Sequence, residues 1–182
     1  MESGLHVTPS KGKSTLIFKP DESVSGVFLE NRQSTLKTLG NVMPFLEDGS
    51  NLDCYFLNAS KTEYFRVQKH PGDSENAFGI FEVGVLPFMR TGIKPHESAI
   101  PAFETESGIH SGISEAKLFS KKGRSFKLNF EGNYSTYKYE IIEIPYNGKY
   151  KSSFLGKYNM PEYFAEYTFQ NNKLVKFRFG FE

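Results

Sequence analysis

A chain of 182 residues is long enough for one compact domain, or for two small ones, with a real hydrophobic core. Its 22 Lys and Arg residues almost balance its 21 Asp and Glu residues, so no overall field draws it to nucleic acid or to anionic lipid. A single Cys residue excludes an intramolecular disulfide bond and a cysteine-based zinc site. Because the charges balance, we expect no nucleic-acid partner. The lack of any run of about 18 apolar residues also predicts no transmembrane segment.

The first 14 residues, MESGLHVTPSKGKS, are polar and lack the apolar centre of a secretory leader. We expect residues 1–14 to form a flexible tail. Such a start suits a cytoplasmic protein, and it equally suits the mature form of an exported protein whose leader has been removed.

The first half of the chain predicts one short helix followed by strands. Asn31 is a suitable N-cap and Gly40 suits the position after the last helical turn, so we expect a helix over residues 31–40. Turn-forming residues then separate three strand-like segments, residues 53–58, 62–70 and 77–86, which predict an antiparallel sheet. The proline-containing residues 86–101 are interpreted as a connection to the second half.

The second half repeats this order of elements. Ser114 and Gly123 bound a second short helix, and strands are expected over residues 123–132 and 134–144. In a final hairpin, Asn171 and Asn172 favour a tight turn. Its rings (Tyr163, Tyr167, Phe169, Phe177, Phe179 and Phe181) alternate with polar residues, which predicts one dry aromatic face and one wet face.

Residues 18–40 and 103–123 share an ordered pattern. Each has an aromatic residue, an acidic run with Ser, a Gly-Val or Gly-Ile step, a capped short helix and a final Gly. Two copies of about ninety residues suggest a tandem domain rather than a solenoid. We predict an α+β fold of two related halves, residues 15–90 and 91–182, each with a short helical segment packed on an antiparallel β-sheet.

The segment SGIHSGISEAKLFSKKG resembles the motif that begins small bacterial extracytoplasmic domains, namely the β-lactamase-inhibitor-protein-like fold and the SmpA/OmlA outer-membrane lipoproteins. Those domains pack short helices on an antiparallel sheet, sometimes in tandem, and work by binding other proteins. The second copy ends in SKKG instead of Leu-Gly, and the first lacks the second Gly and the Ser. The resemblance implies a periplasmic or secreted location, with a cytoplasmic one as the alternative. The matching residues are Gly108, Ile109, Gly112, Ile113, Ser114 and Gly123 and, less closely, Gly26, Val27, Leu36, Leu39 and Gly40.

Catalytic and metal-binding signatures are not found in the sequence. The four His residues have no ligand spacing, and Cys54 lies in an apolar run that suits an inert buried thiol. Glu104 and Glu106 could form a carboxylate pair, yet acidic residues before a helix more often complement its N-terminus. We expect no enzyme activity, no cofactor and no metal, with a weak carboxylate hydrolase as the third-ranked function.

Aromatic and basic residues supply the candidate binding site. Rings that the core cannot absorb would form a recognition surface, while the alternative is that they only cover a sheet edge. The basic residues after the second helix either form an anion or partner patch or are a solvated helix end. We predict a partner-binding protein of inhibitor, immunity or assembly type, and a small-ligand or glycan binder with a pocket between the halves as the alternative. The candidates are Tyr134, Tyr137, Tyr139, Tyr146, Tyr150, Lys121, Lys122 and Arg124.

Overall fold

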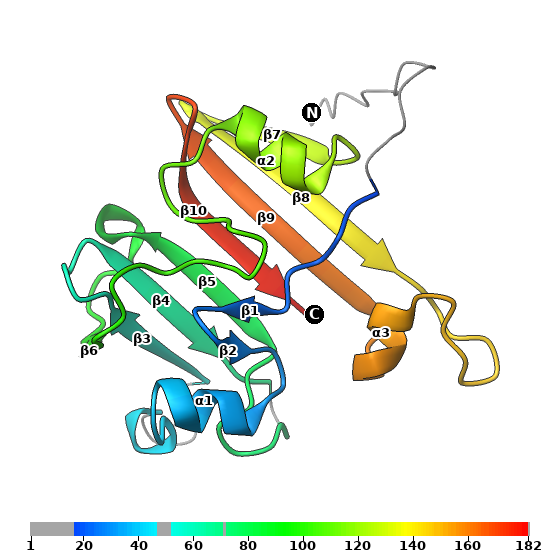
Figure 1. Ribbon diagram of the computed structural model, residues 1–182, viewed down its shortest axis with the longest axis horizontal. Helices are drawn as coiled ribbons and strands as arrows, with labels where there is room; N and C mark the ends of the chain where they lie inside the picture. Colours follow the sequence, from blue (N-terminus) through cyan, green and yellow to red (C-terminus); the bar gives the residue numbers. More distant parts are fainter. Residues whose placement is uncertain (1–16, 47–51, 71, 182) are drawn as a thin grey trace.

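Eight strands of the chain form one sheet, in the order β6-β3-β4-β5-β10-β9-β8-β7 (Figure 1). The computed structural model describes residues 17–46, 52–70 and 72–181, so the predicted tail, residues 1–14, lies outside the described residues. Neighbouring strands are antiparallel, except that β3 pairs with β6 in parallel. The strands are β3 (Asp53–Leu57), β4 (Glu63–Gln68), β5 (Ile80–Val85), β6 (His96–Glu97), β7 (Lys127–Glu131), β8 (Tyr134–Ile142), β9 (Glu162–Gln170) and β10 (Lys173–Gly180).

Of the three α-helices in the described residues, two begin and end where the sequence predicts. The Asn31 side chain accepts a hydrogen bond from the Ser34 N–H at the start of α1, and Ser114 caps α2 in the same way. Gly123 ends α2 with a φ of 78°, a conformation that favours glycine. The described helices are α1 (Arg32–Thr38), α2 (Glu115–Lys122) and α3 (Ser153–Tyr158), with the 3-10 turns η1 (Met43–Phe45) and η3 (Leu86–Phe88).

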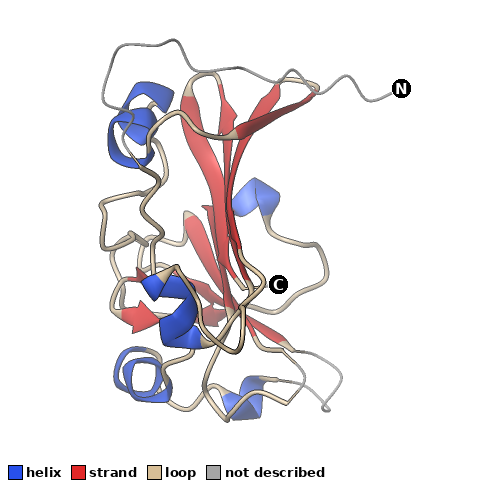
Figure 2. Cartoon of the chain, turned by 90° about the vertical axis from the view of Figure 1, so that its right-hand side faces the viewer, coloured by secondary structure: helices blue, strands red, loops and turns tan. Residues whose placement is uncertain are grey.

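The α+β class is confirmed, and the strands of both predicted halves belong to the same sheet. Strand β5 pairs with β10 over five residue positions, which joins the strands of residues 53–85 to those of residues 127–180. Figure 2 shows the sheet edge-on, with most of the helical segments on one side of it. The opposite face is covered only in part: η3 lies against it, where Phe88 contacts Tyr134, and the Tyr64 and Phe164 side chains on that face are fully buried.

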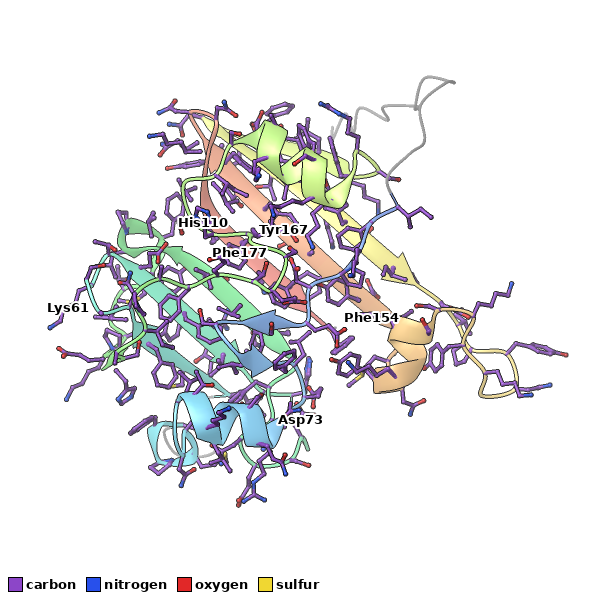
Figure 3. All side chains as sticks on the ribbon, viewed as in Figure 1. Lys61, Asp73, His110, Phe154, Tyr167 and Phe177 are labelled. Atoms are coloured by element: carbon purple, nitrogen blue, oxygen red, sulfur yellow. The ribbon has the colours of Figure 1, made fainter. Side chains whose placement is uncertain are left out.

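The covered face of the sheet carries the hydrophobic core. Tyr167 and Phe177 come from the adjacent strands β9 and β10, and both lie inside the molecule (Figure 3). Leu118 of α2 and Leu155 of α3 pack into the same cluster. Because alternate residues of a strand face opposite sides, the predicted dry aromatic face of the final hairpin becomes the centre of this core.

The two segments that share the Gly-apolar step lie side by side. A small hairpin of β1 (Ser23–Val24) and β2 (Val27–Phe28) forms the first, and Val24 bridges to Thr105 in the second. Ser25 donates its N–H to the carbonyl oxygen of Glu104 at 2.8 Å. Gly26 has a φ of 86° and Gly108 a φ of 75°, so both steps use the left-handed conformation that favours glycine.

A buried ion pair fixes the chain before β1 to the end of α2. Lys122 Nζ lies 2.8 Å from Asp21 Oδ2, and both side chains are 1% exposed. Lys122 also donates to the carbonyl oxygen of Lys19 at 2.8 Å. Tyr163 donates its hydroxyl to the backbone of Asp21 at 2.9 Å, which ties the same segment to β9. This polar cluster therefore links segments that are far apart in the sequence.

Candidate functional site

The side of the sheet opposite the core, which η3 covers in part, forms a polar face. It consists of the side chains that alternate with the core residues along β4, β5, β7, β8, β9 and β10. These residues surround a shallow hollow of about 490 Å³. The polar face comprises Arg66, Gln68, Glu82, Asn129, Thr136, Glu166, Thr168, Lys176 and Arg178.

A row of alternating charges crosses this face from strand to strand. Arg66 stands opposite Glu82, Glu82 opposite Arg178, Arg178 opposite Glu166, and Glu166 opposite Lys138. Directly opposed residues of opposite charge stabilise a sheet by roughly 0.2 to 1 kcal/mol a pair. The row therefore holds the charged groups of the polar face in a fixed pattern.

One end of this row is held by closer contacts. Arg66 Nη2 lies 2.7 Å from Asp53 Oδ2 and its Nη1 lies 3.9 Å from Glu82 Oε2. The Tyr64 hydroxyl donates to Glu82 Oε1 at 2.7 Å. Burial, and then the nearby Glu82 charge, raise the pKa of Tyr64, so the phenol stays protonated and remains a donor. The Arg66 side chain is 20% exposed, and these contacts fix its position.

A second row of residues gives the hollow its hydrogen-bonding character. Lys176 stands opposite Gly84 on one side and Thr168 on the other, so neither neighbour in the sheet supplies a counter-charge. Thr168 and Thr136 place their hydroxyl oxygens 3.1 Å apart. Asn129 follows at the end of the row, opposite Thr136. The hollow thus offers an ammonium group beside hydroxyl and amide groups.

The predicted tyrosines do not form one surface. Tyr137 and Tyr139 are 6% and 1% exposed, so their assignment to an exposed recognition surface is wrong. They stand opposite Tyr167 and Ala165, whose side chains belong to the core. Tyr139 instead donates its hydroxyl to the carbonyl oxygen of Gly123 at 2.8 Å and closes the end of α2.

The other three tyrosines are spread over the molecule. Tyr134 lies at the edge of the polar face, where its ring contacts the ring of Phe88 in η3, with 5.4 Å between the centroids. Tyr150 packs partly against the core, and Tyr146 is 81% exposed in the loop before α3. Of these, only Tyr134 lies next to the polar face.

The predicted basic patch is divided by burial. Lys122 is buried in its ion pair with Asp21 and cannot contact a partner. Its assignment to a surface patch is therefore wrong. Lys121 donates its Nζ to the Ser107 carbonyl oxygen, and the Arg124 guanidinium lies 4.5 Å from the Phe119 ring centroid. These two cations stabilise the end of α2, in keeping with the alternative reading of a helix end.

The glutamates considered for acid-base chemistry have structural contacts. Glu106 accepts hydrogen bonds from the N–H groups of Glu22 and Ser23 and from the Ser23 hydroxyl. Glu104 pairs through its backbone with Ser25 and forms a β-bridge to His110. The Glu106 carboxylate therefore fixes the chain before β1.

A separate titratable group lies above Gly79. A Cβ atom at Gly79 would meet Glu30 Oε1 at 2.6 Å and the His70 ring at 2.7 Å, so both side chains cover this glycine. Glu30 Oε1 is buried and has no hydrogen-bond partner among the described residues. Burial, and then the charge of Asp73, raise the pKa of Glu30, while His70 and Lys69 oppose the shift.

Replacing Glu30 with Gln is expected to stabilise the protein at neutral pH, by on the order of 1 kcal/mol. A carboxyl group whose folded pKa is raised favours the folded state below its unfolded pKa and loses that advantage as the pH rises through the folded value. Urea unfolding at several pH values measures this. The difference between Glu30→Gln and wild type should grow from about pH 4 towards neutrality. A constant difference would contradict the assignment.

The described residues contain no group of three or more His, Cys, Asp or Glu side chains placed to hold a metal ion. Within the same residues, no helix has the length and apolar character needed to cross a membrane.

The residues that sequence reasoning missed are those of the polar face on β4, β5 and β10. Their signal was present where Arg66 lies between Phe65 and Val67 and in the alternation of KFRF, whose Lys176 and Arg178 lie on the polar face. Comparison of the chain with protein-family models, curated proteins and solved structures found no match.

Proposed function

We propose that this is a non-catalytic binding protein that contacts a partner protein through the polar face. The observation that supports this most is the unequal covering of the sheet: the α-helices pack on the aromatic side, while charged and polar side chains line a hollow on the other side. Ordered charges on a rigid sheet give specificity and a fast encounter with a complementary surface.

Charge and hydrogen bonding define the kind of partner surface. Three cations (Arg66, Lys176 and Arg178) and two carboxylates (Glu82 and Glu166) line the hollow. Lys176 lies among hydroxyl and amide groups, so an acidic side chain of the partner would find an ammonium group and several donors there. The polar face therefore suits a partner with mixed charge and at least one central carboxylate.

A glycan ligand is the second candidate. The hollow spans β5 and β10, the strands at which the predicted halves meet. Its hydroxyl and amide groups, from Thr136, Thr168 and Asn129, are of the kind that bind polar ligands. Small-molecule pockets are mostly apolar and enclosed, whereas this hollow is shallow and polar. That difference favours a protein partner.

The proposal includes two related halves, residues 15–90 and 91–182, and a periplasmic or secreted location. The halves are supported by the repeated order of a Gly-apolar step, a short capped helix and antiparallel strands. The location is supported by the resemblance of residues 108–123 to extracytoplasmic domains, and a cytoplasmic location is the alternative.

Lys176→Glu tests the proposed surface, with Lys117→Glu as its matched control on the exposed side of α2. The immobilised full chain should capture the same partner in the wild-type and Lys117→Glu forms. We expect Lys176→Glu to bind that partner at least about tenfold more weakly, because a buried like charge at an interface costs several kcal/mol. Equal binding by both variants would refute the surface. Release of the partner by a soluble oligosaccharide would favour the glycan candidate.

A further inference from the structure

Strand β7 is an edge of the sheet with an open side. Among the described strands it pairs only with β8, and Figure 1 shows it at one end of the sheet. Four of its five residues are exposed, and the Phe130 side chain is 63% exposed. An exposed edge presents unpaired backbone groups that can bind another strand.

The hairpin geometry fixes which backbone groups face outward. Glu131 and Tyr134 are paired across the two-residue turn of Gly132 and Asn133, and Gly132 has a φ of 59°. Residues that flank a two-residue turn form the hydrogen-bonded pair that closes the hairpin. Every second residue of an antiparallel strand bonds to the same neighbour. The N–H and C=O groups of Leu128 and Phe130 therefore point away from β8.

The sequence of this edge, Lys-Leu-Asn-Phe-Glu, is complementary to itself when reversed. We propose that β7 pairs antiparallel with β7 of a second copy of the chain, about a two-fold axis at Asn129. Lys127 then stands opposite Glu131 of the second copy, and Leu128 stands opposite Phe130 of the second copy. The axis makes each of these pairs occur twice, as an isologous interface requires.

The backbone pattern independently fits this register. With Asn129 on the axis as a non-hydrogen-bonded pair, the adjacent positions become hydrogen-bonded pairs. Those positions are Leu128 and Phe130, whose backbone groups face outward. The proposed register thus satisfies the free donors and acceptors of the edge.

Charged residues on an edge strand can serve only to prevent pairing with other strands. On β7, their arrangement instead favours pairing with a second copy. Lys127 lies opposite Lys138 in the sheet, and both ammonium groups contact the Glu140 carboxylate, so two cations share this one anion. Glu131 of a second copy would bring another carboxylate beside Lys127. On the other side of the strand, Leu128 of that copy would cover the exposed Phe130 ring.

The consequence is a continuous sheet through two copies. Asn129 also lines the hollow of the polar face, so the two hollows would meet at the axis. This self-association depends on β7 alone and does not rest on the proposed partner. A monomeric protein could still bind its partner through Lys176, so the two proposals fail separately.

Sedimentation of the full chain over a range of concentrations tests the dimer. We expect a reversible dimer for wild type and for Glu75→Lys, a control with the same charge change at an exposed position between β4 and β5. Glu131→Lys should weaken dimerisation about tenfold, because two opposite-charge pairs become like-charge pairs. The double exchange Lys127→Glu with Glu131→Lys should restore it to within about threefold. A wild-type monomer at about 1 mM, or no effect of Glu131→Lys, would refute the interface.

Cross-linking tests the register. Cα atoms of a non-hydrogen-bonded antiparallel pair lie about 4.5 Å apart, which a disulfide bond can span. Asn129→Cys should therefore form a covalent dimer under mild oxidation, and native Cys54 should not interfere because it is 4% exposed. Lys127→Cys should not, because its two copies would lie about 13 Å apart along the strands. The reverse result, or no cross-link at Asn129→Cys in a folded protein, would contradict the register.

Discussion

Replacing Lys122 with Met is expected to lower the free energy of unfolding by about 3 to 5 kcal/mol. The Lys122 ammonium and the Asp21 carboxylate are both 1% exposed and lie 2.8 Å apart. Burial lowers the pKa of Lys122, and the adjacent Asp21 charge opposes that shift. Without the ammonium group, Asp21 would remain buried with an uncompensated charge, and Asp21 Oδ1 already lacks a hydrogen-bond partner among the described residues. Urea unfolding measures the loss.

Two variants separate the lost ion pair from other effects. Lys117→Met makes the same exchange on the exposed side of α2 and should change stability by less than about 0.5 kcal/mol. Adding Asp21→Leu to Lys122→Met should recover much of the loss, because a buried ion pair can be replaced by apolar residues at little net cost. If the double variant is no more stable than Lys122→Met, the uncompensated charge is not the cause.

The sequence predicted those elements whose local patterns agree with their final surroundings. Capping residues Asn31 and Ser114 and the glycine at 123 placed α1 and α2. In the final hairpin, Asn171 and Asn172 have φ values of 51° and 59°, as their turn-forming character predicts. Alternation of rings and polar residues also made the dry face of that hairpin predictable, although Phe164 breaks the pattern and is buried on the opposite face.

Features that depend on long-range contacts could not be predicted in this way. Strand β8 has tyrosines on both faces, and only its pairing with β9 shows that Tyr137 and Tyr139 face the core. Lys122 looks like one more cation at a helix end until the fold brings Asp21 against it. Helix α3 has six residues with Gly156 inside, so its propensity is weak and its packing through Leu155 decides its structure.

The polar face could not be predicted from the sequence for the same reason. Each strand shows which of its residues alternate, but the charged row exists only once β4, β5, β10, β9 and β8 are adjacent. In particular, the pairing of β5 with β10 brings Glu82 opposite Arg178 from distant parts of the chain. A binding surface on a sheet is therefore a property of strand order as much as of any single motif.

Replacing Phe179 with Ala is expected to cost about 3 to 5 kcal/mol of stability, because it would leave a cavity in the core. Phe179 is fully buried on β10, near the centre of the sheet. Its ring lies 5.8 Å from that of Phe81 on β5 and 6.4 Å from that of Tyr163 on β9, so it joins the strands of both predicted halves. Denaturant unfolding should show one cooperative transition at a lower midpoint.

Tyr146→Ala is the matched aromatic control, since its ring is 81% exposed, and it should change stability by less than about 0.5 kcal/mol. Both variants leave the polar face unaltered, so partner binding by folded Phe179→Ala should match that of wild type. A stability loss below about 1 kcal/mol would mean that the ring is not part of a close-packed core. If partner binding were then lost, the aromatic side of the sheet, and not the polar face, would be the binding surface.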